Sequence, residues 1–178
     1  MGEDTLSINR APVLTLWAVV VAEHLGHDRN TALSLGKAVA GLAAQAKGRL
    51  LGIYGPSKDP DKRGTAKKAG LGEELWVELC GRNVPAVRTA EGIRAVKGAE
   101  PIAPEPVERY LHKSFGEGYD AARNAMGALA ASMDEAELAR DAYELYVRFR
   151  PSVPAGKAGW GARGELDLQL LRSLGRRR

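Results

Sequence analysis

Two consecutive helix patterns, separated by a short glycine-containing break, occupy residues 9–51 and constrain the fold more than any other stretch. In the first pattern, large apolar residues recur three or four positions apart, as on one face of an α-helix: Leu14, Trp17, Val21 and Leu25. The second pattern does the same with Leu35, Val39, Leu42 and Ala46. We therefore expect a helical hairpin that forms the core against which the later chain packs.

The ends of these two helices have local sequence signals. Asn9 is placed to cap the first helix, and Pro12 is tolerated in its first turn, where amide groups lack partners within the helix. Gly26 lies where a residue with positive φ would end that helix, and Asp28 is placed to cap the next one.

Each helix of the hairpin also carries a row of small residues. The rows are Thr15, Ala18 and Ala22 in the first helix, and Ala32, Gly36, Ala40 and Ala43 in the second. Facing rows of this kind let two helix backbones approach closely. A second interpretation stays open, in which the small rows form the interface of a homodimer.

The middle of the chain changes character twice. Residues 52–72 are polar, rich in lysine and glycine and without apolar periodicity, which predicts a basic mobile linker. In 73–102, the alternation of Leu75, Val77 and Leu79 predicts a β-strand, and residues 84–88 predict its antiparallel partner. Pro85 favours an edge position for that partner because proline has no amide N–H. A turn or short helix from Thr89 and a third strand near Ile102 complete this β element.

Helical patterns return in residues 103–174. Pro104 suits the first turn of one helix, residues 119–133 form another, and Asp134 with Glu137 matches a capping box that begins a third. A last helix over 166–174 precedes the basic tail at 175–178. The fold class is therefore mainly α (α+β), with a single domain over 1–178. A small antiparallel β-hairpin is inserted between the N-terminal helical hairpin and the C-terminal helical half.

The net charge of +4 conceals an uneven distribution of charge. Basic residues outnumber acidic ones in 47–70 and again in 148–178, so the remainder of the chain is net negative. Clusters of this kind favour an anionic partner more strongly than the overall charge does. The alternative is that basic loops and tails serve solubility.

The leading functional hypothesis is non-enzymatic binding of nucleic acid, mostly through the phosphate backbone. On the second helix, one face carries small, amide and basic residues where a solvated face usually carries long charged ones: Asn30, Ser34, Lys37, Gly41, Gln45 and Gly48. Trp160, in a glycine-rich loop, is placed to stack on an exposed base. The candidate contact residues are Lys37, Gln45, Lys47, Arg49, Lys58, Lys62, Arg63, Lys67, Lys68, Lys157, Trp160 and Arg163.

Catalysis has no support in the sequence, and we expect no cofactor. His24, His27 and Asp28 lie close together, but they do not complete a zinc site. Cys80 follows an apolar strand, which favours a small buried side chain over a nucleophile. A third alternative is an enzyme in which the glycine-rich loop 155–164 covers a substrate.

The sequence also predicts where the protein resides. The apolar part of the first helix is too short to span a bilayer, and no secretory signal is visible at the N-terminus. The single cysteine excludes a disulfide within the chain. We therefore expect a cytoplasmic protein without a membrane partner.

Three runs of the sequence, INRAPVLTLW, LGKAVAG and GWGARGELDL, resemble runs in small uncharacterised bacterial proteins. The resemblance covers most of the chain. It implies no activity, cofactor or site residue.

Overall fold

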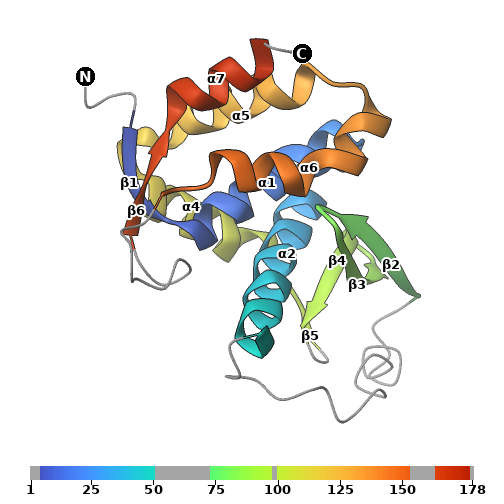
Figure 1. The fold of residues 1–178 in the computed structure, drawn as a ribbon. Helices are drawn as coiled ribbons and strands as arrows, with labels where there is room; N and C mark the ends of the chain where they lie inside the picture. Colours follow the sequence, from blue (N-terminus) through green and yellow to red (C-terminus); the bar gives the residue numbers. More distant parts are fainter. Residues whose placement is uncertain (1–4, 51–72, 98–99, 153–162, 177–178) are drawn as a thin grey trace.

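The computed structural model describes residues 5–50, 73–97, 100–152 and 163–176, and at 45–50, 163 and 175–176 it describes the backbone (Figure 1). The helices are α1 (Arg10–His24), α2 (Arg29–Leu50), α4 (Pro104–Phe115), the 3-10 turn η3 (Gly116–Gly118), α5 (Tyr119–Ala131), α6 (Glu135–Phe149) and α7 (Leu168–Arg176). Two small antiparallel sheets accompany them. The prediction of a mainly helical α+β fold is confirmed.

Helix α1 lies at the centre of the molecule (Figure 1). Every residue from Pro12 to Ala22 is buried. This helix is in contact with α2, α4, α5 and α6, so apolar side chains are needed around its whole circumference. The predicted helical hairpin of α1 and α2 is therefore confirmed as the core of the fold.

The small residues of the hairpin bring α1 and α2 close together. A Cβ atom on Gly36 would lie 2.6 Å from Val19 Cγ2 and 2.9 Å from the backbone oxygen of Thr15. All members of the two predicted rows are buried: Thr15, Ala18, Ala22, Ala32, Gly36, Ala40 and Ala43. These rows therefore serve packing within the chain, and their side chains are not exposed for a second copy.

A four-stranded antiparallel sheet lies against α2. Its order is β2 (Glu74–Leu79), β3 (Arg82–Thr89), β4 (Gly92–Lys97) and β5 (Glu100–Pro101). The predicted hairpin corresponds to β2 and β3, joined at Cys80 and Gly81, whose φ angles are 49° and 74°. The prediction of a turn or short helix through Ile93 and Val96 is wrong, because these residues lie in β4. A tight turn at 90–91 leads into β4 through Gly92, which has a φ of 127°.

The prediction that Pro85 marks an edge strand is also wrong, since β3 lies between β2 and β4. The amide of Arg88 donates to the backbone oxygen of Glu73, so by alternation the nitrogen of Pro85 points toward the β4 side. The register between β3 and β4 ends at the pair Ala86–Ala95, one residue short of Pro85. Pro85 therefore lies just beyond the last paired residue of β3 and β4, where no N–H donor is needed. For this reason an inner strand can contain a proline at this position.

A second sheet, which was not predicted from the sequence, joins the two ends of the described chain. Strand β1 (Thr5–Asn9) pairs antiparallel with β6 (Arg163–Asp167), and Leu6 lies opposite Leu166. The last helix therefore begins at Leu168 and not at the predicted position 166. The carboxylate of Asp167 accepts hydrogen bonds from the amides of Gln169 and Leu170, at 2.9 and 3.2 Å, which fixes this boundary.

The predicted caps are confirmed at two helices and wrong at one. The Asp28 carboxylate accepts hydrogen bonds from the hydroxyl and the amide of Thr31, and the hydroxyl bond, as the largest cause, lowers the pKa of Asp28. Asp134 and Glu137 form the predicted capping box. Asn9 stands at the N-cap position of α1, but its side chain makes no capping bond. The third residue of that helix is Pro12, which has no N–H to donate.

The sequence predicts that the apolar part of the first helix is too short to span a bilayer. Among the helices of the described ranges, none is both long and apolar enough to cross one.

Candidate nucleic-acid interface

The exposed face of α2 carries part of the stripe that the sequence predicted. Asn30, Lys37 and Gly41 are exposed, and a Cβ atom on Gly41 would meet nothing within 4 Å. Ser34 is fully buried, so its assignment to the exposed stripe is wrong. Helix α2 also contains the backbone of Gln45, Lys47 and Arg49 in its last turns. Lys37 is therefore the first exposed cation of this face.

Lys37 lies beside two residues that are distant from it in the sequence. Its Nζ atom is 4.2 Å from the centroid of the Tyr110 ring on α4, a cation–π contact. Partial burial, followed by the positive charge of Lys97 on β4, lowers the pKa of the Lys37 ammonium. The ion pairs formed among the described residues include neither Lys37 nor Lys97. Positive charges that lie near each other without a paired carboxylate attract anions such as phosphate.

Ser34 joins helix α2, which carries Lys37, to strand β4, which carries Lys97. Its hydroxyl donates to the backbone oxygen of Ile102 at 2.7 Å and accepts from the amide of Ala95 at 2.8 Å. Ser34 is one helical turn before Lys37, and Ala95 is two residues before Lys97. This pair of hydrogen bonds fastens α2 to β4 next to both cations.

Replacing Ser34 with alanine is expected to lower the free energy of unfolding by about 1–3 kcal/mol, because the buried Ala95 amide and Ile102 carbonyl lose their partner. Urea unfolding followed by circular dichroism measures this change. Ser132, whose exposed hydroxyl donates to Leu129 O, provides the matched control. Ser132→Ala should shift the free energy by no more than about 0.5 kcal/mol. Equal effects of the two substitutions would contradict the assigned role of Ser34.

The remaining predicted contact residues are not brought into this site by the described structure. Lys58, Lys62, Arg63, Lys67, Lys68, Lys157 and Trp160 lie outside the described residues. The backbone of Arg163 is in β6, opposite Asn9. Acidic and basic residues are equal in number within the described ranges, so the net charge of +4 resides in the rest of the sequence.

Lys97 and Tyr110 are members of the site that the sequence did not predict. Tyr110 is partly buried against the core, and its ring also contacts the Lys37 ammonium. Lys97 ends a strand that was read as a turn or helix. No local signal links positions 37, 97 and 110, because helix α2, strand β4 and helix α4 meet only in the tertiary structure.

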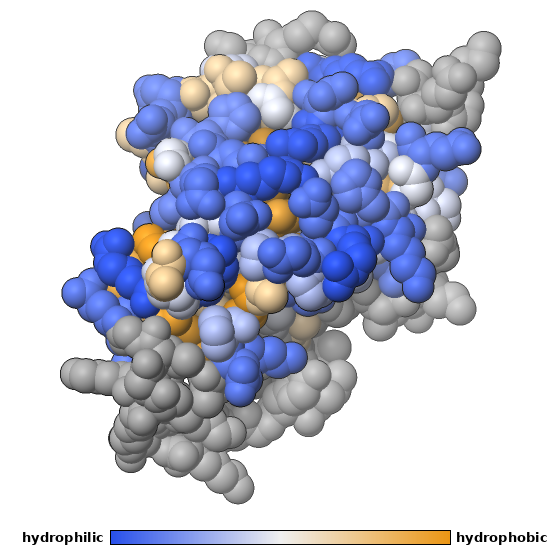
Figure 2. Space-filling model, turned by 180° about the vertical axis from the view of Figure 1, so that it is seen from behind, coloured by the Kyte–Doolittle hydropathy of each residue, from blue (hydrophilic) through white to orange (hydrophobic). Residues whose placement is uncertain are grey.

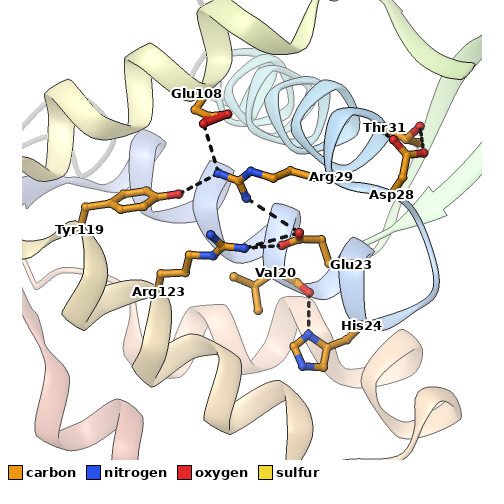
Figure 3. A network of polar contacts seen from close by, with 9 residues as sticks. All are labelled: Val20, Glu23, His24, Asp28, Arg29, Thr31, Glu108, Tyr119 and Arg123. Atoms are coloured by element: carbon orange, nitrogen blue, oxygen red, sulfur yellow. Dashed lines mark hydrogen bonds and ion pairs between the residues drawn. The ribbon is translucent and has the colours of Figure 1, made fainter. Parts of the chain in front are cut away.

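A second cluster of charges joins four helices at the start of α2 (Figure 3). Arg29 donates to the Tyr119 hydroxyl at 3.1 Å and lies 3.7 Å from a carboxylate oxygen of Glu108. Glu23 lies 3.8 Å from Arg29 and accepts a hydrogen bond from Arg123 at 3.2 Å. The cluster connects α1, α2, α4 and α5 and holds the N-terminus of α2 in place.

An open groove of about 460 Å³ lies beside this cluster, between α1 and α5. It is lined by Val20, Glu23, His24, Asp120, Arg123, Asn124 and Gly127. The Glu23 carboxylate is already engaged by two guanidinium groups, and Nδ1 of His24 lies 3.0 Å from Val20 O (Figure 3). Within the described ranges, no three metal-ligating side chains come together. This arrangement joins helices and does not form a metal centre.

Cys80 occupies a tight turn and is fully buried. Burial raises the pKa of its thiol to about 12, so the thiolate that a nucleophile requires does not form at neutral pH. This agrees with the expectation of a small buried side chain.

Comparison with known proteins provides no relative for this chain: no family model, no curated protein and no solved structure matches it.

Proposed function

We propose that this protein binds nucleic acid without catalysing a reaction, mainly through the phosphate backbone. The proposal is supported above all by Lys37 and Lys97, whose positive charges are near enough to repel each other and which take part in none of the ion pairs of the described residues. Phosphate contacts by lysine supply most of the affinity of such proteins and none of their sequence preference.

The position of Lys37 on α2 gives further support. The C-terminal half of α2 extends beyond the other helices (Figure 1). Lys47 and Arg49 lie in its last turns, about 15–18 Å from Lys37 at 1.5 Å per residue. A projecting helix with cations along it can follow the backbone of a duplex or enter its major groove.

The basic segments outside the described residues extend the same proposal. Lys58, Lys62, Arg63, Lys67 and Lys68 follow α2 in the sequence, and we assign them further phosphate contacts. Lys157 and Arg163, the latter at the start of β6, are assigned a second contact region on the same grounds of charge, and Trp160 is assigned to it as a residue that stacks on a base. A cytoplasmic location, where nucleic acid is accessible, is part of this proposal.

The test is fluorescence anisotropy of labelled duplex and single-stranded DNA and RNA, titrated at several salt concentrations. Affinity should fall steeply as salt rises. The double variant Lys37→Gln/Lys97→Gln should bind more weakly and reduce the slope of log K against log salt by about 1–2, because each lost phosphate contact removes about 0.9 for duplex DNA. Arg140 and Arg148, two exposed cations on α6, provide a charge-matched control in the double variant Arg140→Gln/Arg148→Gln.

Two outcomes would overturn the proposal. The first is the absence of binding near physiological salt. The second is an equal loss of affinity in Arg140→Gln/Arg148→Gln and in the Lys37/Lys97 variant, which would indicate attraction by overall charge and not a site on α2. Replacing Lys62, Arg63, Lys67 and Lys68 with alanine tests the adjoining basic segment in the same titration.

A further inference from the structure

The described surface offers a partner more charged groups than apolar ones. Three large apolar side chains are exposed within the described ranges, and they lie on three different elements: Trp76, Val147 and Leu170. The face of the molecule turned away in Figure 1 is largely hydrophilic, with scattered apolar residues (Figure 2). Cations that have no carboxylate partner are therefore the features of this surface that indicate binding.

Two arginines meet where the start of α1 lies against the end of α6. The Nε atom of Arg10 donates to the backbone oxygen of Pro151 at 2.9 Å, so the Arg10 guanidinium lies beside the residue that follows Arg150. Partial burial, followed by the positive charge of Arg150, lowers the pKa of Arg10, so the two charges are near enough to repel each other. Both side chains are partly exposed, and neither takes part in the ion pairs of the described residues. This pair of charges therefore attracts an anion.

Two tyrosines of α6 connect this corner to a third arginine. The Tyr146 hydroxyl donates to the backbone oxygen of Arg10 at 3.3 Å, and the ring centroids of Tyr143 and Tyr146 are 5.8 Å apart. Burial, as the largest cause, raises the pKa of Tyr146, so its hydroxyl stays protonated and adds no negative charge. The guanidinium of Arg82, at the start of β3, lies 5.8 Å from the centroid of the Tyr143 ring. Arg82 is likewise outside the ion pairs of the described residues.

The chemistry of these cations favours a terminal phosphate. A guanidinium binds phosphate oxygens through two parallel N–H groups, and the bond of Arg10 Nε to Pro151 leaves the two Nη groups for this purpose. Two guanidinium groups that repel each other gain most from an anion with two charges. A terminal phosphate carries about −1.5 to −2 at neutral pH, whereas a phosphate inside a strand carries a single negative charge. The end of a strand therefore fits this pair better than its interior does.

We propose that Arg10 and Arg150 bind the terminal phosphate of a single nucleic-acid strand, and that Arg82 contacts the phosphate next to it. This inference rests on the proposed nucleic-acid function and names a ligand for its second contact region. The two adjoin each other, because the backbone of Arg163 lies opposite Asn9, the residue before Arg10. A phosphorylated peptide carries the same terminal dianion, but it lacks the adjoining phosphates for Arg82.

The test compares short single strands of one sequence that carry an internal fluorophore and end in a 5′-phosphate, a 3′-phosphate or hydroxyl groups alone. Fluorescence anisotropy at one salt concentration measures their affinities. At least one phosphorylated strand should bind the parent protein about tenfold more tightly than the hydroxyl strand. Equal affinities of all three strands would overturn the inference. So would equally tight binding of a neutral peptide that carries one phosphoserine.

Arg150→Gln is the main variant, because the Arg150 side chain makes none of the hydrogen bonds of the described structure. It should reduce the preference for the phosphorylated strand from about tenfold to about twofold. Arg10→Lys, which keeps the charge and removes the paired donors, should also reduce it. Arg148→Gln alters an exposed cation of the same helix and should leave the preference unchanged. An equal reduction in Arg148→Gln and Arg150→Gln would overturn the assigned site, and circular dichroism checks that each variant is folded.

Two further variants separate the terminal phosphate from the rest of the strand. Arg82→Gln should weaken the binding of all three strands and keep the preference for the phosphorylated one. Lys37→Gln/Lys97→Gln should do the same, because it removes contacts on α2. Absence of binding by every strand would overturn both the proposed function and this inference. Binding of every strand with equal affinity would overturn this inference alone.

Discussion

Replacing Trp17 with alanine is expected to lower the free energy of unfolding by about 3–5 kcal/mol, a large part of the stability of a typical domain. Trp17 is fully buried, and its indole N–H donates to the backbone oxygen of Ala142 at 2.8 Å. Its ring meets that of Phe149 edge to face, with centroids 5.2 Å apart. The substitution leaves a cavity between α1 and α6 and removes a buried hydrogen bond.

Urea unfolding followed by far-ultraviolet circular dichroism measures this loss without depending on the removed fluorophore. Trp17→Phe separates the two contributions, since it keeps an aromatic ring and removes the N–H donor. It should cost less than Trp17→Ala. A loss below about 1 kcal/mol for Trp17→Ala would show that α1 is not packed against α6 as described.

The second large effect is expected at Gly36, where alanine should lower the free energy of unfolding by about 1–3 kcal/mol. An added Cβ would lie 2.6 Å from Val19 Cγ2 and 2.9 Å from Thr15 O. A backbone oxygen cannot move away as a flexible side chain can, so α1 and α2 must separate. Alanine is otherwise the better residue in a helix, which makes a destabilisation at this position informative.

Gly127 on α5 provides a control of the opposite sign. It is also a helical glycine, but an added Cβ would meet nothing within 4 Å. Gly127→Ala should therefore raise the free energy of unfolding by about 0.5–1 kcal/mol, from helix propensity alone. Thermal unfolding of both variants checks the pair. A stabilising Gly36→Ala would contradict the close approach of α1 and α2.

Local sequence signals predicted the helical parts of the fold well. The apolar spacing of α1 and α2, the cap at Asp28 and the capping box at Asp134 are short-range features, and the structure contains them all. Asn9 shows the limit of such signals: it stands at the N-cap position without a capping bond, and Pro12 removes one of the two N–H groups that such a bond can use. Asp167 is the opposite case. Its side chain caps the last helix, but the predicted start at position 166 did not take this cap into account.

The candidate site was predictable only in part. The stripe on α2 correctly places Lys37 and Gly41 at the surface and wrongly includes Ser34. Whether a polar residue on a helix is exposed depends on what lies opposite it, and here β4 and Ile102 supply hydrogen-bond partners for the Ser34 hydroxyl. The strand pattern assigns Trp76 to one face of the strand, but it does not tell which of the two faces is covered. The exposure of Trp76 therefore could not be predicted from the sequence.

The sequence by itself determined the two-helix core, most helix boundaries and the first β-hairpin, because each depends on residues a few positions apart. Only the tertiary structure decided the pairing of β1 with β6, the contact of Lys37 with Tyr110 and the approach of the Lys97 charge to Lys37. The physical reason is the same in each case. A short strand or a single lysine acquires its role from a partner far away in the chain, and folding around the buried α1 helix brings that partner into contact.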